Sequence, residues 1–226
     1  IYFTEPMADV VLEQIERNAG NIVRASMFVR QGKRLPVREY DDVTVRDGRI
    51  GDEELRTFLD EDSVVLCSYN NTRTEYNRRA RNLLGFKGQL PQVGEKVICT
   101  YNQHGYKMMN GEQGIVIRYE EIPEKDVDSD EPDGMMLIVF KSLTDGVERY
   151  AKFNPLSFDM DKDVATTAMR GVGGFDFGYA LTIHKSQGSE WLRVLIIEEV
   201  LRGVSYAKLM YTAITRAIDY LAIRRF

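Results

Sequence analysis

The stretch that decides the fold is YALTIHKSQGSEW, which runs from Tyr179 to Trp191. It begins with a short apolar run that predicts a buried strand, and it continues with polar residues that present hydrogen-bonding groups at a strand end. The pair Lys185-Ser186 also ends a phosphate-binding P-loop, but that loop requires glycines at fixed positions before the lysine. His184 precedes Lys185 and no glycine stands five positions earlier, so this stretch is not a P-loop, and the rest of the chain has none.

The segments around this stretch predict a parallel sheet. SVVLCSY (63–69) is apolar almost throughout, as in strands covered on both faces, and RVLIIEEV (193–200) and YLAIRRF (220–226) also predict buried strands. SYAKLMYTAITRA (205–217) predicts a helix that begins after Ser205. Because neither outer part of the chain can bury a core alone, we expect these parts to share one parallel α/β sheet.

Two earlier segments predict further helices. NIVRASMFVRQGK (21–33) places three residues on one face and Gly32 at its end; the three are Ile22, Ser26 and Val29. NNTRTEYNRRARNLLG (70–85) has the spacing of a capping box at Thr72 and Glu75, and ends at Gly85. Its predicted buried stripe is Tyr76, Ala80, Leu83 and Leu84, and its predicted outer face carries Arg78, Arg79 and Arg81.

Residues 91–168 have a different pattern. Short alternating runs flank an Asn-Gly pair at 110–111 and an Asp-Gly pair at 145–146, which are signals of β-hairpins. Four or more short strands in so few residues predict a small antiparallel barrel. The Gly-rich stretch RGVGGFDFG (170–178) then leads back to the parallel strands.

Charge and composition leave a nucleic-acid partner open. The chain has 226 residues and a net charge of −5, but the stretch Glu120–Gly134 alone carries −7, so the remainder carries +2. We expect this acidic stretch to be a solvated loop. The apolar runs are too short for a membrane helix and no signal peptide opens the sequence, which indicates a cytoplasmic protein with no membrane partner. Cys67 and Cys99 lack metal-ligand spacing and are expected to be buried thiols.

The motifs together resemble superfamily-one DNA helicases of the RecD and Dda branch. YALTIHKSQGSEW followed by LMYTAITRA resembles motifs V and VI of that family, and LEQIERNAGNIVRASMFVRQGK resembles its motif IV region. VGEKVICTYNQHGYKMMNGEQGIV resembles the SH3-like barrel that this branch inserts in its second RecA-like domain. The family's P-loop and its motifs II and III are absent. The resemblance therefore implies the C-terminal half of a helicase from a bacterial or phage-infected cell.

This resemblance implies a RecA-like parallel sheet flanked by helices, with an inserted antiparallel SH3-like barrel. The expected divisions are 1–90 for the first RecA-like segment, 91–168 for the barrel and 169–226 for the second RecA-like segment. ATP and Mg²⁺ are expected in the full-length protein, held mainly by its N-terminal RecA-like domain, and neither is expected on this chain alone. The other expected partner is single-stranded DNA, and 5′-to-3′ polarity is implied by the family.

The same resemblance assigns roles on the nucleotide side. Arg216 and Arg17 match the family's two arginines that approach the γ-phosphate, where such charges stabilise phosphoryl transfer. Gln187 and Gly188 are expected beside the nucleotide, and Glu190 near its ribose. The competing interpretations are a surface cation for Arg216 and a surface ion pair for Arg17.

On the DNA side, the resemblance implies contacts by Thr182, His184 and Lys185. We expect these side chains at the carboxyl end of a central strand, with Gln187 and Glu190 on the same rim and within reach of Arg216. A structural role for His184 is the alternative. For Trp191, packing in the core is the favoured interpretation.

Two further regions are candidates for DNA contact. Arg73 and free N–H groups at the start of the 70–85 helix predict a phosphate site, although solvated helix charges explain them equally well. Tyr101 and Tyr106 of the barrel are expected to stack on bases, together with His104, and a core role for the tyrosines is equally open. The alternative for the whole chain is a nucleic-acid- or partner-binding module without ATP turnover, in which two γ-phosphate arginines would have no purpose.

Overall fold

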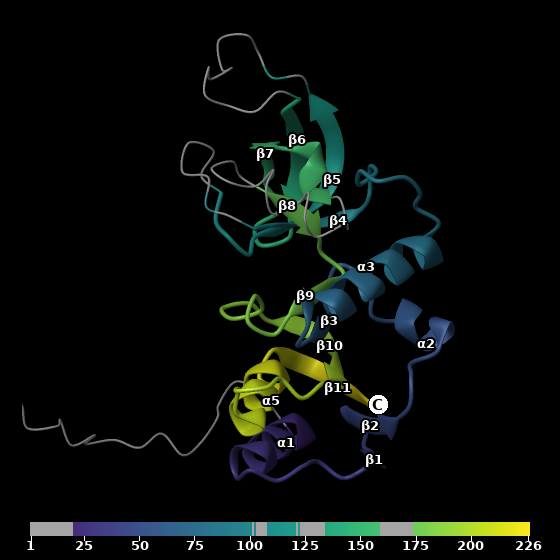
Figure 1. Cartoon of the computed structure of the whole chain (residues 1–226), viewed down its shortest axis with the longest axis vertical. Coiled ribbons are helices and arrows are strands. Elements are labelled where there is room, and N and C mark those ends of the chain that lie inside the picture. Colours follow the sequence, from purple (N-terminus) through teal and green to yellow (C-terminus); the bar gives the residue numbers. More distant parts are fainter. Residues whose placement is uncertain (1–19, 101, 103–107, 121, 123–133, 159–173) are drawn as a thin grey trace, which may run out of the picture.

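The computed structural model describes residues 20–100, 102, 108–120, 122, 134–158 and 174–226 (Figure 1). These residues form a six-stranded sheet and a five-stranded sheet. Figure 1 shows the five-stranded sheet above the six-stranded one, with α3 between them. Arg17, Tyr101, His104 and Tyr106 lie outside the described residues, as does most of the acidic stretch 120–134.

The six-stranded sheet is the predicted parallel sheet. Its order is β1-β2-β11-β10-β3-β9, and every neighbouring pair is parallel except β1 and β2. The strands are β1 (Arg38–Glu39), β2 (Val43–Asp47), β3 (Ser63–Cys67), β9 (Ala180–Thr182), β10 (Trp191–Glu198) and β11 (Ala217–Arg225). All five residues of β3 are buried, as its apolar sequence predicts. Strand β9 stands at one edge of the sheet, so the expectation that it is central is wrong.

Helices cover both faces of this sheet. On one face, α1 (Gly20–Arg30) and α5 (Tyr206–Ile214) pack with alternate strand residues such as Leu66 and Ile196. On the other face, α2 (Asp52–Arg56) and α3 (Asn70–Leu84) pack with Val65 and Leu195. The sequence predicts that two helices end at a glycine, and both glycines adopt the left-handed conformation: φ is 78° at Gly32 and 84° at Gly85.

Helix α3 differs from its prediction at both its start and its outer face. Its first helical residue is Asn70, and no side chain of its own caps it, so the capping box of Thr72 and Glu75 is wrong. Arg81 is buried rather than exposed, because its guanidinium pairs with the buried carboxylate of Glu95 at 2.7 Å. Leu84 is exposed, whereas Tyr76 and Ala80 are buried as predicted.

The five-stranded sheet is antiparallel throughout, in the order β7-β6-β5-β4-β8. Its strands are β4 (Lys96–Cys99), β5 (Gln113–Glu120), β6 (Met136–Ser142), β7 (Glu148–Phe153) and β8 (Phe175–Phe177), and a 3-10 turn, η3, follows at Pro155–Phe158. Gly111 and Gly146 have φ of 94° and 72°, as the Asn-Gly and Asp-Gly turns require. The hairpins are thus confirmed, and the closed barrel and the domain boundaries stay predictions.

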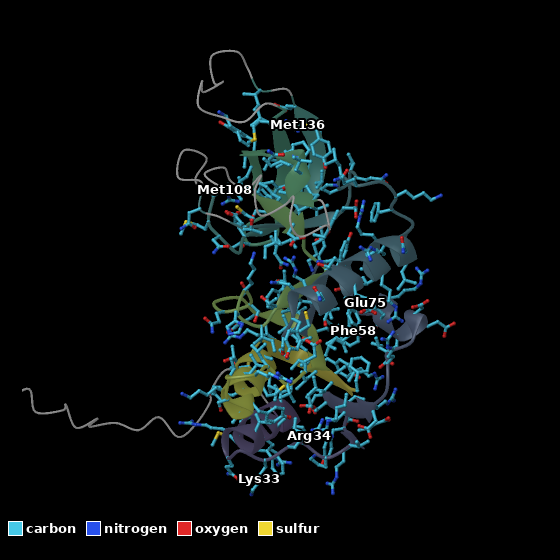
Figure 2. The ribbon with its side chains drawn as sticks, viewed as in Figure 1. Lys33, Arg34, Phe58, Glu75, Met108 and Met136 are labelled. Carbon is cyan, nitrogen blue, oxygen red and sulfur yellow. The ribbon has the colours of Figure 1, made fainter. Side chains whose placement is uncertain are left out.

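One hydrophobic core joins the two sheets. Val65 and Leu195 of the parallel sheet belong to the same buried cluster as Val97, Phe140 and Phe175 of the antiparallel sheet. Figure 2 shows side chains filling the molecule from Met136 in the upper sheet to Phe58, which follows α2 beside the lower sheet. The chain passes from one sheet to the other at Gly178, between β8 and β9.

Candidate nucleotide and nucleic-acid site

The loop of residues 183–190 runs from the carboxyl ends of the parallel strands to their amino ends. Thr182 is the last residue of β9, at the carboxyl edge, and Trp191 is the first residue of β10, at the amino edge. The loop begins with a tight turn in which the Lys185 and Ser186 amides donate to the Thr182 carbonyl at 2.9 and 3.1 Å. Glu190 directly precedes Trp191, so its expected position on the same rim as Thr182 is wrong.

The first half of the loop lies beside the start of α3. Thr182 is in register with Cys67 at the end of β3, and the Ile183 amide donates to the Cys67 carbonyl at 2.9 Å. Thr182 is buried, whereas His184 and Lys185 are exposed. His184 is therefore free of the core, which is what contact with an external ligand requires.

Arg73 and Lys185 meet around a carboxylate that the sequence did not point to. Asp176, in the middle of β8, forms an ion pair with Arg73 Nη1, and Arg73 Nε has no hydrogen-bond partner among the described residues. Although Lys185 is exposed as a residue, desolvation of its ammonium by the groups around it lowers the pKa; the Asp176 carboxylate opposes this shift and Arg73 adds to it. Two predicted DNA contacts thus share one charged cluster, although 112 positions separate them in the sequence.

The start of α3 is occupied by a second carboxylate. Glu199, directly after β10, accepts hydrogen bonds from the backbone amides of Ser68 at 2.7 Å and Tyr69 at 3.1 Å. The Thr72 hydroxyl also donates to it. Glu199 thus places a carboxylate beside this helix start, and the predicted phosphate site at the first-turn amides stays a prediction.

Arg216 lies against the second half of the loop. It ends the turn after α5, and its Nη1 donates to the Ser189 carbonyl at 3.0 Å. Its Nε and Nη2 donate to the Thr212 carbonyl and the Thr215 hydroxyl, at 3.1 and 3.2 Å. The guanidinium is half-buried.

The predicted nucleotide-side residues of the loop are all exposed next to this arginine. They are Gln187, Gly188 and Glu190, and φ at Gly188 is 92°, which glycine adopts without strain. Ser189, the contact of Arg216, lies between them. The structure therefore brings Arg216 to the same loop as these three residues.

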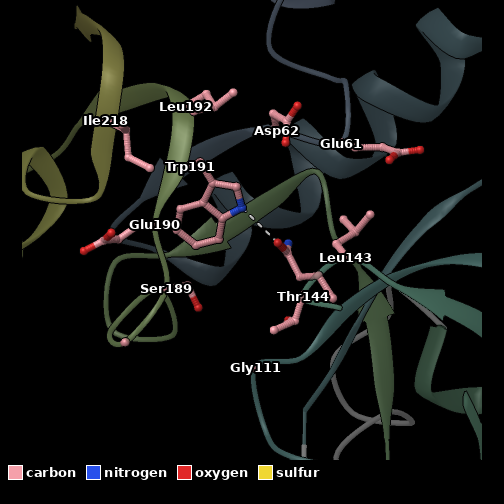
Figure 3. A pocket seen from close by; sticks show the side chains of 12 residues that line it. Glu61, Asp62, Gly111, Leu143, Thr144, Ser189, Glu190, Trp191, Leu192 and Ile218 are labelled. Atoms are coloured by element: carbon pink, nitrogen blue, oxygen red, sulfur yellow. Dashed lines mark hydrogen bonds between the residues drawn. The ribbon is translucent and has the colours of Figure 1, made fainter. Parts of the chain in front are cut away.

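A cleft of about 440 Å³ separates this part of the loop from the antiparallel sheet (Figure 3). Trp191 and Gln113 form part of its wall, and the indole Nε1 donates to Gln113 Oε1 at 2.9 Å. Trp191 is only 5% exposed, so its predicted core packing is confirmed. Sequence reasoning did not single out Gln113, which sits among unremarkable strand residues.

Within the described ranges, no group of three or more His, Cys, Asp or Glu side chains is arranged to hold a metal ion. The acidic end of β10 is an ordinary strand end, because the Glu198 carboxylate pairs with Arg225 at 2.8 Å and Arg34 at 2.7 Å. In the same part of the chain, no helix is long and apolar enough to cross a membrane.

Residues 177–223 match the family model of the UvrD-like helicase C-terminal domain. The ATP-dependent RecD2 DNA helicase of Deinococcus radiodurans is 32% identical over 127 residues, which are 56% of this chain and 13% of that protein. The RecBCD enzyme subunit RecD of Mycolicibacterium smegmatis is 28% identical over 179 residues, 74% of this chain and 26% of that protein. The chain thus spans about a quarter or less of these relatives.

Solved structures share the fold. The Pif1 helicase from Bacteroides, in complex with ADP-AlF3 and single-stranded DNA, superposes with a TM-score of 0.53 at 14% identity, over 95% of this chain and 51% of that one. The Pif1 helicase from Candida albicans gives 0.50 at 18% identity, over 91% and 53%. The α/β fold is therefore that of a helicase motor domain.

Proposed function

Because the chain carries a UvrD-like helicase C-terminal domain and is related to RecD helicases, we propose that it is the C-terminal half of an ATP-dependent DNA helicase with 5′-to-3′ polarity. The N-terminal RecA-like domain of the same protein supplies the P-loop and the Mg²⁺ ligands. ATP is held between the two halves, as in other two-domain motors. The antiparallel sheet belongs to an SH3-like barrel inserted in this half.

The observation that carries the proposal is the contact of Arg216 with Ser189, in the loop that bears Gln187, Gly188 and Glu190. A cation that reaches the γ-phosphate only when two domains close accelerates phosphoryl transfer by about 10³–10⁵. Arg216 has this role, and Arg17 supplies a second charge. Gln187, Gly188 and Glu190 contact the nucleotide from the same loop.

Single-stranded DNA runs along the carboxyl edge of the sheet. His184, Lys185 and Arg73 contact its phosphates, whereas Thr182 is buried; the cationic groups gathered around Asp176 support this. Tyr101 and Tyr106 stack on bases. The Bacteroides Pif1 structure with bound single-stranded DNA has the same fold, which supports DNA as the ligand class.

The experiment that tests this function is Arg216→Ala in the longer protein. Turnover should fall by about 10³-fold or more, and KM for ATP should change little, because the charge matters most in the transition state. ATP hydrolysis stimulated by oligo(dT) is the measurement. Arg56→Ala is the matched control, since Arg56 is an exposed arginine at the end of α2, outside the proposed site.

Near-normal turnover in the Arg216→Ala protein would favour the alternative, a nucleic-acid-binding module without ATP turnover. The 226-residue chain alone serves as the blank, because it has no P-loop and should not hydrolyse ATP. The coding sequence that precedes Ile1 provides a simpler check. It should encode a P-loop and an Asp-Glu pair.

A further inference from the structure

Gln113 joins the antiparallel sheet to the parallel sheet through both ends of its amide. It begins β5, yet its side chain points to the other sheet: Oε1 accepts from Trp191 Nε1 at 2.9 Å, and Nε2 donates to the Gly178 carbonyl at 3.1 Å. Gly178 leads into β9, and Trp191 begins β10. Gln113 therefore contacts the residue that leads into β9 and the first residue of β10, the two strands that the loop of residues 183–190 joins, and a dashed line in Figure 3 marks its bond to Trp191.

Trp191 also bonds to Arg216, through its backbone. Its backbone amide donates to the Arg216 carbonyl at 2.9 Å, and Arg216 Nη1 donates to the Ser189 carbonyl at 3.0 Å. A continuous series of hydrogen bonds thus runs from β5 to the arginine proposed to act on the nucleotide. Each of these bonds joins groups that are buried or half-buried.

Gln113 itself is held firmly in the antiparallel sheet. Its backbone pairs with Ile98 of β4, and its carbonyl accepts from the Leu143 amide at 2.9 Å. The next residue, Gly114, packs so closely on β6 that an added Cβ would lie 2.1 Å from Phe140. Because closely packed elements move together, a displacement of the antiparallel sheet carries Gln113 with it.

We propose that Gln113 is a positioning residue that couples DNA binding at Arg73, whose partner Asp176 lies in β8 of the antiparallel sheet, to the placement of Arg216, through Trp191. The inference rests on the proposed function and adds a regulatory link to the same site. DNA that displaces the antiparallel sheet shifts the indole, and the indole shifts the Arg216 backbone and the end of the 183–190 loop. Gln113 touches neither nucleotide nor reacting atoms.

Trp191 is the one tryptophan in the 226-residue sequence, so its fluorescence reports on this contact directly. Oligo(dT) should change the emission of the wild-type chain. Gln113→Met keeps the side-chain length and removes both hydrogen bonds, so this variant should bind oligo(dT) with similar affinity and show no emission change. Gln92→Met is the matched control: it removes an exposed amide bonded to the Lys87 carbonyl and should behave as wild type.

Steady-state kinetics of the longer protein provide the second measurement. Gln113→Met should lower DNA-stimulated kcat by about 10- to 100-fold with little change in KM for ATP, as expected for a small displacement of a catalytic group. Trp191→Phe removes the Nε1 donor and keeps an aromatic ring in the core, so it should give a similar loss. The double variant should lose no more than either single one, because both remove the same link.

The outcomes separate this inference from the proposed function. If the wild-type chain and the longer protein do not bind oligo(dT), the proposed function is wrong, and the proposed coupling is wrong as well. If oligo(dT) binds but leaves Trp191 emission unchanged, or changes it equally in Gln113→Met, the coupling is wrong and the function stands. Additive kinetic losses in the double variant would also overturn it. Circular dichroism of each variant identifies a loss through misfolding, in which case Trp191→Phe decides.

Discussion

Lys96 shows how far a single side chain can depart from its sequence pattern. It lies in an alternating run, yet all four residues of β4 are buried and the lysine is only 1% exposed. Its Nζ donates to the backbone carbonyls of Asp60, Glu61 and Ser63, at 3.0, 3.2 and 2.6 Å. Burial lowers the pKa of this ammonium from 10.5 to about 8, against the opposing effect of nearby carboxylates such as Asp60.

This pKa predicts a pH dependence of stability. Between pH 8 and pH 10.5 the unfolded chain keeps a proton on Lys96 that the folded chain has released, so the free energy of unfolding rises with pH. From pH 8 to about pH 9.5 the rise should be roughly 1–2 kcal/mol. Urea unfolding across this range measures it. Lys96→Met should remove this component, and an equal slope in both proteins would show that Lys96 titrates normally.

Prediction of single residues from the sequence succeeded where the residue belongs to a motif. It failed where the role of the residue comes from a partner far away in the chain. The motifs predicted that Arg216 lies near Gln187, and the structure has Arg216 bonded to Ser189, in the loop that carries Gln187. Asp176, Glu199 and Gln113 were missed, because each gains its role from a residue more than 70 positions away. No local pattern marks such a partner.

At the scale of elements, α3 depends on a residue that follows another strand. The Glu199 carboxylate accepts hydrogen bonds from two backbone amides just before the helix and from the Thr72 hydroxyl in its first turn. It satisfies these donors and its negative charge complements the helix dipole. The residue that follows β10 therefore fastens the start of α3 to the parallel sheet.

Glu199→Ala should accordingly destabilise the chain by about 1–2 kcal/mol, the usual cost of losing a helix cap. Glu75→Ala is the matched control, because Glu75 is exposed and its pairing with Arg49 is 3.8 Å long, so its loss should cost less than about 0.5 kcal/mol. Chemical denaturation gives both values. A larger loss of stability from Glu75→Ala would support the predicted capping box at the start of α3.

The elements themselves were largely predictable, and their ends and edges were not. Periodicity identified α1, α3, α5 and the buried strands, and glycine marked two helix ends. The rim assignment failed because β9 stops at Thr182 after three residues, so the loop that follows crosses to the opposite edge of the sheet. Strand length depends on pairing with β3, which the run YALTI does not encode.

At the scale of the molecule, the two sheets share both a core and buried polar contacts. Arg81 of α3 pairs with Glu95 at the start of β4, and its guanidinium lies 4.2 Å from the centre of the Phe177 ring of β8. Arg81 also donates to the Gly88 carbonyl at 2.7 Å. Separating the sheets would leave these charged groups without partners, which is costly inside a protein.

We therefore expect both sheets to unfold in one cooperative transition. Trp191 fluorescence reports on the junction and far-ultraviolet circular dichroism on all elements, so their urea midpoints should coincide. Separate midpoints, with the fluorescence change first, would mean that the antiparallel sheet detaches before the parallel sheet unfolds.

The strand order also dictates when each sheet can form during synthesis. Strands β4, β5, β6 and β7 pair with near neighbours in the chain, so hairpins can assemble as soon as residue 153 is available. In the parallel sheet, β11 lies between β2 and β10, so each residue of β2 pairs with a residue 178 positions later in the chain. The ribosome thus delivers the antiparallel sheet first, and the exposed apolar strands β2 and β3 are the part of the nascent chain that most needs protection from aggregation.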